Sequence, residues 1–246
     1  MRTIKLTVQY DGTEFVGWQR QDQGLSIQGA LEDALGRIDG RQVTVHGAGR
    51  TDAGVHAIGQ VASARIHSSL DDETLARAMN ANLPPTIRLS AVETVGDDFH
   101  ARFCAVSKTY EYRIWNGPSV PPFLRLYTWQ VIPPLDLDVL LNATAALPGE
   151  HDFSAFQGSG STTHSPVRTV IAASWHAQGP DAPLTFEVSG DGFLRHMVRS
   201  LAGTLVEIGL RRRPIDHLAR LLATPDRSQA GRTAPPSGLF LVRVDY

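Results

Sequence analysis

The sequence has little cysteine and no long hydrophobic run. Its 246 residues include one cysteine, Cys104, which excludes an internal disulfide framework and a cysteine-based zinc cluster. No apolar run approaches the roughly 18 residues that a membrane-spanning helix needs. The opening segment 1–6 alternates polar and apolar residues and has no signal-peptide core. We therefore expect a protein of the reducing cytoplasm that has no membrane partner.

Motifs for metals and nucleotide cofactors are missing as well. The nine histidines are scattered, without a His-Glu-x-x-His pair, so we expect no metal site. The glycine-rich segment 46–56 has the spacing Gly-x-Gly-x-x-x-x-Gly and precedes an expected strand, which excludes the dinucleotide-binding fingerprint. It also lacks the Gly-Lys-Ser/Thr of a phosphate-binding loop. We expect no cofactor.

Positive charge is not in excess, but it is clustered. The chain carries 23 Lys and Arg against 25 Asp and Glu, a net charge of −2, which excludes a globally basic nucleic-acid binder. Residues 195–232 nevertheless hold eight arginines and three acids, whereas residues 71–98 hold six acids and two arginines. Only two residues are lysine, and arginine suits bidentate phosphate contacts, although a GC-rich coding bias produces the same skew. An RNA partner would have to meet a local arginine-rich surface.

With 42% hydrophobic residues the composition is globular, and the periodicity of the first half predicts the order β-α-β-β-α-β. The helix after Ser26 has an N-cap residue and an apolar face, and a second helix begins with the capping-box pair Ser69 and Asp72. The expected strands span residues 3–10, 42–46, 58–66 and 87–95. This is the ferredoxin-like order.

The second half repeats the pattern without significant sequence identity to the first. We expect helices over 136–147 and along the apolar stripe 194–208, and an extra helix that begins at Pro214 and carries Ile215 on its apolar face. The expected strands span residues 110–115, 167–175, 184–188 and 239–245. The polar stretch 157–163 predicts a mobile loop.

These patterns predict an α+β protein. It comprises two fused ferredoxin-like βαββαβ units with mainly antiparallel sheets, and we expect a catalytic cleft between them. The first unit, 1–105, carries the glycine-rich segment, and the second, 106–246, carries the arginine-rich helix region. Many RNA-binding modules use the free face of such a sheet, but that is an analogy.

One carboxylate, Asp52, lies in the glycine-rich segment with Arg50 beside it. From composition alone, the simplest interpretation is a long β-hairpin turn in which the aspartate makes an Asx-turn.

The segment Gly49–His56 resembles the signature loop of the tRNA pseudouridine synthases of the TruA family. The resemblance extends over almost the whole chain, because other segments follow in the family's order, and it implies two ferredoxin-like halves. These segments are Tyr10-Asp11-Gly12, Gly17-Trp18-Gln19-Arg20, Asn80–Pro84, Asp98–Phe103, Lys108–Tyr112, Asp152–Phe156, Phe193–Arg199 and Gly238–Val242.

The resemblance implies a cofactor-free isomerisation in which uracil is detached from ribose, turned, and rejoined through C5. The family's catalytic aspartate matches Asp52. A carboxylate suits this role because it stabilises oxocarbenium character and is a competent nucleophile at a sugar. Two routes stay open: Asp52 attacks ribose C1′, or it assists an elimination across the sugar.

Four further residues match substrate-contacting positions of the family. Arg199 matches the cation that pairs with the catalytic carboxylate, and its alternative is a solvated surface arginine. Tyr110 matches a tyrosine that stacks on the flipped uracil, whereas a core tyrosine is the alternative. Leu239 resembles an apolar residue against the target base, and Arg50 resembles the arginine that helps displace the nucleotide. The alternative for Leu239 is an ordinary core position, and the alternative for Arg50 is a hydrogen bond to loop carbonyls.

The resemblance also implies tRNA as the partner, modification of the anticodon stem-loop at positions 38–40, and a homodimer. Two other functions stay open. One is a non-catalytic RNA-binding protein built from duplicated ferredoxin-like units. The other is a hydrolase that cuts a glycosidic bond, which would usually need a second carboxylate near Asp52.

Overall fold

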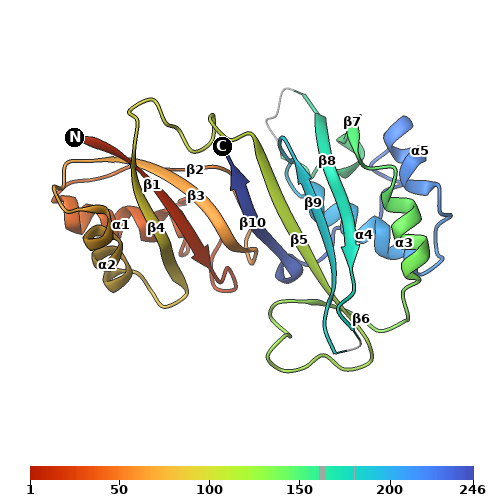
Figure 1. The fold of residues 1–246 in the computed structure, drawn as a ribbon. Coiled ribbons are helices and arrows are strands. Elements are labelled where there is room, and N and C mark those ends of the chain that lie inside the picture. The colour runs from red at the N-terminus through yellow and green to blue at the C-terminus, as the bar shows by residue number, and fades with distance from the viewer. Residues whose placement is uncertain (161–164, 180) are drawn as a thin grey trace. The chain divides into compact units, whose positions relative to one another are not determined.

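The computed structural model describes residues 1–160, 165–179 and 181–246 and divides them into two compact units (Figure 1). The first unit comprises Met1–Val106 with Phe240–Tyr246, and the second comprises Ser107–Leu239. This division differs from the expected one at the last strand, because all of 106–246 was expected in the second unit. The reason is parallel pairing, because Phe240 and Leu241 lie opposite His56 and Ala57 in the first sheet.

The first sheet has the order β4-β1-β3, and β2 pairs with β3 on its other side. These pairings are antiparallel, which gives the strand order of a ferredoxin-like unit. The alternation in β1 buries Ile4, Leu6 and Val8 completely. The strands are β1 (Arg2–Tyr10), β2 (Val45–Gly47), β3 (His56–Ile66) and β4 (Ile87–Val95).

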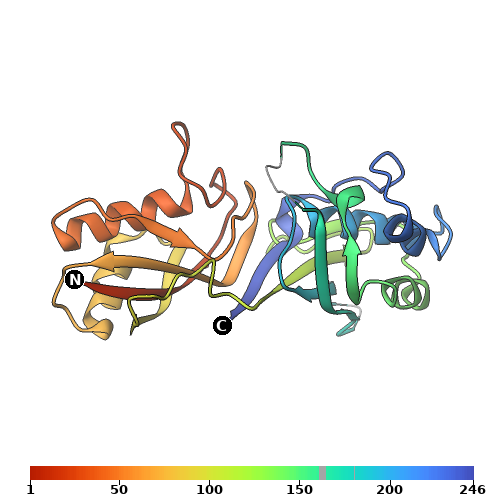
Figure 2. The same cartoon turned by 90° about the horizontal axis from the view of Figure 1, so that it is seen from above.

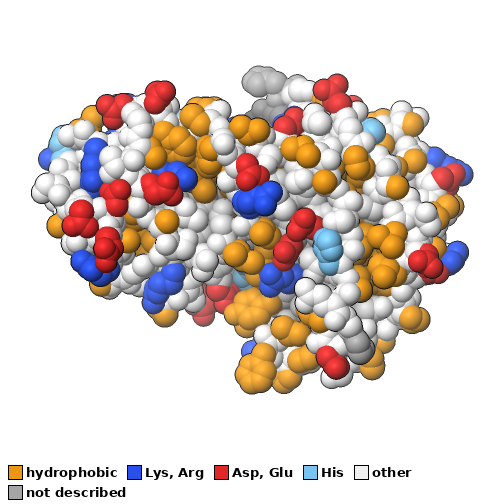
Figure 3. Space-filling model, in the orientation of Figure 1, with side chains coloured by type: hydrophobic (Ala, Val, Ile, Leu, Met, Phe, Trp, Pro, Cys, Tyr) orange, Lys and Arg blue, Asp and Glu red, His pale blue; other side chains and the backbone are white. Residues whose placement is uncertain are grey.

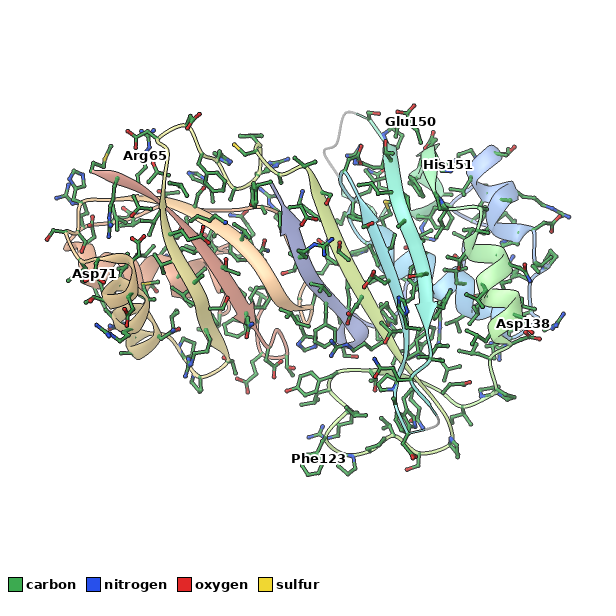
Figure 4. All side chains as sticks on the ribbon, in the orientation of Figure 1. Arg65, Asp71, Phe123, Asp138, Glu150 and His151 are labelled. Atoms are coloured by element: carbon green, nitrogen blue, oxygen red, sulfur yellow. The ribbon has the colours of Figure 1, made fainter. Side chains whose placement is uncertain are left out.

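Two helices, α1 (Ile27–Asp39) and α2 (Asp72–Asn82), pack against one another in this unit (Figure 1). Ser26 caps α1 as predicted, and its side chain accepts a hydrogen bond from the Gly29 amide at 3.2 Å. The predicted cap of α2, Ser69, is wrong. Asp71, labelled in Figure 4, caps the helix by accepting from the Thr74 amide at 2.8 Å. Its carboxylate also suits the positive end of the helix dipole.

The second sheet has the antiparallel order β5-β9-β8-β7, and β6 pairs in parallel with β5. In chain order, β5, α3, β8, β9, α4 and β10 repeat the βαββαβ pattern, while β6, β7 and α5 are additions. The strands of the second unit are β5 (Ser107–Asn116), β6 (Trp129–Val131), β7 (Gly149–Asp152), β8 (Val167–His176) and β9 (Leu184–Gly190). The last strand of the chain, β10 (Leu239–Asp245), pairs with β3 in the first unit.

Helices α3 (Leu137–Thr144), α4 (Met197–Gly209) and α5 (His217–Ala223) pack together in the second unit (Figure 2). Two predictions need correction. The helix predicted over 136–147 ends at Thr144, and a turn follows it, in which the Leu147 amide donates to the Thr144 carbonyl. The helix predicted to begin at Pro214 begins at His217, and Ile215 is exposed.

The expected fold class is confirmed: the protein is α+β, with two ferredoxin-like units and mainly antiparallel sheets. The expected mobile loop over 157–163 lies partly outside the described residues, because 161–163 are not among them. Within the described part of the chain, no helix has the length and apolar character needed to cross a membrane.

Candidate active site

The backbone around Asp52 is held by a second segment of the first unit, residues 11–18. Gly17 and Asp52 form an isolated antiparallel bridge. The Trp18 amide donates to the Thr51 carbonyl at 3.0 Å, and the Gly54 amide donates to the Phe15 carbonyl at 3.4 Å. Residues 51–54 of the glycine-rich segment are thus paired, unlike a free hairpin turn, and backbone hydrogen bonds hold the backbone that carries Asp52.

This close pairing depends on glycine at two positions. A Cβ atom at Gly12 would lie 1.9 Å from the carbonyl oxygen of Val55. Gly17 has a φ of +111°, a conformation that other residues rarely adopt, and a Cβ there would meet the Thr51 carbonyl at 2.7 Å. Both glycines allow the two segments to approach at a distance that no side chain permits.

Buried polar side chains hold the other side of the loop. The Tyr10 hydroxyl and Thr51 Oγ1 are hydrogen-bonded at 2.8 Å, and Gln60 Nε2 donates to the Gly49 carbonyl at 2.9 Å. Burial raises the pKa of Tyr10 to about 12, against the opposing effect of its hydrogen bonds to Thr51 and Gln60. The phenol therefore stays neutral at physiological pH and acts as a fixed part of this network.

His56, the first residue of β3, contacts residues 11 and 12 of the neighbouring segment through its side chain. Its Nδ1 accepts a hydrogen bond from the Gly12 amide at 3.1 Å. The Asp11 carboxylate lies 3.2 Å from the same nitrogen. The ring stacks on Phe240 with centroids 4.7 Å apart, which connects the loop to β10.

Asp52 itself is partly exposed, and Arg50 on the same loop is exposed. The loop thus presents one carboxylate on a backbone that is hydrogen-bonded to two neighbouring segments. The described residues contain no group of three His, Cys, Asp or Glu side chains that could hold a metal ion. Trp18 is buried and lies against Gly47, so it anchors the early loop rather than offering a ring to solvent.

In the second unit, Arg199 lies in the first turn of α4 and is partly buried. Its Nε donates to the Ala234 carbonyl at 2.8 Å, and the Ala234 amide donates to the Arg199 carbonyl at 3.1 Å. This reciprocal pair of hydrogen bonds differs from the alternative of a solvated surface arginine. The guanidinium is held in one orientation by the backbone of a separate segment.

Tyr110 and Tyr112 are both buried on β5. Tyr110 packs edge-on against Phe193, with ring centroids 5.1 Å apart. Tyr112 donates from its hydroxyl to the Pro235 carbonyl at 2.7 Å. Leu239 begins β10 directly after the 3₁₀ turn Pro236–Gly238 and is buried. The strand period of two places both tyrosines on one face.

The structure thus brings Asp52 and Arg50 together on one loop of the first unit and places Tyr110, Arg199 and Leu239 in the second. Sequence reasoning missed the polar residues that hold the loop. Gln60, which has only apolar neighbours at 57–59 and 61–62, was the available signal, because a polar side chain at a buried position needs a partner. The fold and the loop define a class of protein: a duplicated ferredoxin-like protein that presents one rigidly held aspartate.

Comparisons with known proteins identify the family. A family model described as "tRNA pseudouridine synthase" matches residues 6–104 and 143–246. The chain is 44% identical over 246 residues to tRNA pseudouridine synthase A of Myxococcus xanthus, covering 100% of this chain and 92% of the relative. It is 41% identical over 247 residues to tRNA pseudouridine synthase A of Streptococcus pneumoniae strain P1031, covering 100% and 99%. The chain belongs to the tRNA pseudouridine synthase family.

A solved structure gives a much weaker match. A chain in the "Crystal Structure of a Cbf5-Nop10-Gar1 Complex" is 12% identical, with a TM-score of 0.39, and the match covers 97% of this chain and 48% of that one. This likeness is too low to support an argument. The family assignment depends on the sequence matches.

Proposed function

We propose that this protein converts uridine to pseudouridine in tRNA, and that it acts in the anticodon stem-loop at positions 38–40. The observation that carries the proposal is the full-length similarity to tRNA pseudouridine synthases, which includes the segment Gly49–His56. The held position of Asp52 in that segment adds a physical reason. The product is an isomer of the substrate, so the overall reaction consumes no co-substrate.

Asp52 supplies the catalytic carboxylate in this proposal. The bond between N1 of uracil and C1′ of ribose breaks, and a bond between C5 and C1′ forms. The proton on C5 is lost and N1 gains one, so the atoms balance without an added reagent. Asp52 attacks C1′ or assists an elimination across the sugar, and either role needs an ionised carboxylate at a fixed position.

The second unit supplies substrate-binding residues. Tyr110 is proposed to stack on the extruded uracil, a contact worth about 1–3 kcal/mol for an aromatic ring and a base. Leu239 is proposed to contact the same base through its apolar side chain. Arg199 supplies a fixed cation, for which a carboxylate or a phosphate is a suitable partner. In the first unit, the exposed Arg50 is proposed to help displace the target nucleotide.

We also propose that the protein acts as a cytoplasmic homodimer, in which two arginine-rich regions contact one tRNA. On the face drawn in Figure 3, acidic and basic side chains are interspersed among the described residues. The arginines at 195–232 therefore carry the electrostatic part of this proposal.

The test is incubation of the purified protein with an unmodified tRNA transcript, followed by mapping of pseudouridine. We expect pseudouridine at one or more of positions 38–40 and no free uracil. Tight tRNA binding without product would favour a non-catalytic RNA-binding protein, and release of uracil would favour a glycosidic hydrolase. Pseudouridine at other positions only would contradict the assignment to the anticodon stem-loop.

A further inference from the structure

Residues 231–235 form a short segment, here called the strap, that crosses helix α4 in the second unit. Its residue Ala234 is fully buried and exchanges two hydrogen bonds with Arg199. One of them engages the side chain of Arg199 at Nε, and the other engages its backbone carbonyl. The orientation of the guanidinium therefore depends on where the strap lies.

The strap is fastened to α4 by contacts that leave it little freedom. A Cβ atom at Gly203 would lie 1.7 Å from the carbonyl oxygen of Arg232, so the strap lies directly on the helix backbone there. The Gly231 amide donates to Thr204 Oγ1 at 2.9 Å, and the Arg232 amide donates to Glu207 Oε1 at 3.3 Å. These contacts fix the start of the strap along about one turn of the helix.

Two aromatic residues hold the strap from the side of the sheet. The Tyr112 hydroxyl donates to the carbonyl of Pro235, the residue after Ala234, at 2.7 Å. The Arg232 guanidinium lies 4.6 Å from the ring centroid of Trp129, a cation–π contact. Burial keeps the pKa of Tyr112 well above its usual value, so its hydroxyl remains a donor across the physiological range.

We propose that the strap is a positioning element for Arg199, and that Gly203 and Tyr112 are positioning residues that act through it. Because Nε donates to the Ala234 carbonyl, the strap fixes the plane of the guanidinium, a group that favours bidentate binding of an oxyanion. This inference rests on the proposed function, in which Arg199 binds at the reacting site. It goes beyond that function in one respect: the orientation of Arg199 is set by the strap and by the residues that hold the strap in place.

The test compares strap variants in two backgrounds. Gly203→Ala forces the strap off the helix, and Tyr112→Phe removes one hydrogen bond while it keeps the ring. Each variant is made in the wild-type chain and in the Arg199→Lys chain, which keeps the charge but has no Nε donor of the arginine type. Tyr246→Phe is the matched control, because its hydroxyl also donates to a backbone carbonyl, that of Ala101 at 2.8 Å, in the first unit.

We expect kcat/KM for pseudouridine formation to fall about 100-fold with Gly203→Ala, the order of loss that a displacement of about 1 Å produces, and about three- to tenfold with Tyr112→Phe. Tyr246→Phe should retain wild-type activity. In the Arg199→Lys background, Tyr112→Phe should cause no further loss, because the hydrogen bond it supports is already absent. Tm is measured for every variant, to separate activity from folding.

Loss of activity of the same size in both backgrounds would overturn the proposal, because the strap would then act on folding or on another residue. Full activity of Tyr112→Phe and Gly203→Ala in the wild-type chain would overturn it as well. Should Gly203→Ala not fold, Tyr112→Phe alone decides the question. A wild-type protein that makes no pseudouridine would contradict the proposed function instead, and that result is visible before any variant is compared.

Discussion

Substitution of Gly12 by alanine should separate the two segments that hold Asp52. The new Cβ atom would lie 1.9 Å from the Val55 carbonyl oxygen, whereas ordinary contacts are 3.4–4 Å, so the backbone must move by about 1.5 Å. Val55 is joined to the Asp52 carbonyl by its amide at 3.1 Å, so the displacement reaches the residue that carries the carboxylate. A misplacement of about 1 Å at a reacting group costs about 100-fold in rate, and we expect a loss of this order in kcat/KM.

The assay is steady-state pseudouridine formation, with Tm and tRNA binding measured on the same preparations. Gly36→Ala is the matched control, because Gly36 lies within α1 in the same unit and a Cβ there would meet only the Arg41 carbonyl, at 3.3 Å. It should retain wild-type activity. A folded Gly12→Ala protein with wild-type kcat/KM would refute the claim that close pairing of the two segments positions Asp52.

Three further predictions follow from the same structure. Burial raises the pKa of Tyr10 from 10.0 to about 12 in the folded state, so the folded protein keeps this proton to higher pH than the unfolded chain does. The contribution of Tyr10 to the free energy of unfolding should fall by about 1.4 kcal/mol per pH unit between these values, and Tyr10→Phe should reduce the measured slope by that amount. Asp71→Ala should lower Tm more than Ser69→Ala, and equal effects would contradict the assigned helix cap. Affinity for tRNA should fall steeply as salt rises from low to physiological concentration, and a flat dependence would contradict binding by an arginine-rich surface.

Much of the fold was predictable, because apolar periodicity marks both strands and helices. The alternation of Ile4, Leu6 and Val8 predicts β1, and the apolar stripe up to Ile208 predicts α4. Helix starts were less predictable where several capping residues are adjacent. Both Ser69 and Asp71 precede α2, and only the chain path before the helix decides which of them accepts the amide hydrogen bond.

The resemblance predicts a chemistry for the candidate site, whereas the residues that support its loop were not predictable from the sequence. Asp52 was predicted as the catalytic residue from resemblance, whereas composition alone favoured a turn. The residues that fix its loop, such as Tyr10 and Gln60, come from separate strands, and no local pattern reveals that their side chains meet the loop. The contact between the strap and α4 was not predictable either. Gly203 and Ala234 are 31 positions apart, and no local pattern around either residue indicates that the two segments meet.

The most direct test of the account is the activity of Asp52→Asn. Asparagine has nearly the same shape as aspartate but no negative charge, so the loop and its hydrogen bonds should be retained. We predict that the variant folds with an unchanged Tm, binds unmodified tRNA with near wild-type affinity, and forms no pseudouridine in a single-turnover assay. Pseudouridine formation at the wild-type rate by Asp52→Asn would contradict the assignment of the catalytic carboxylate.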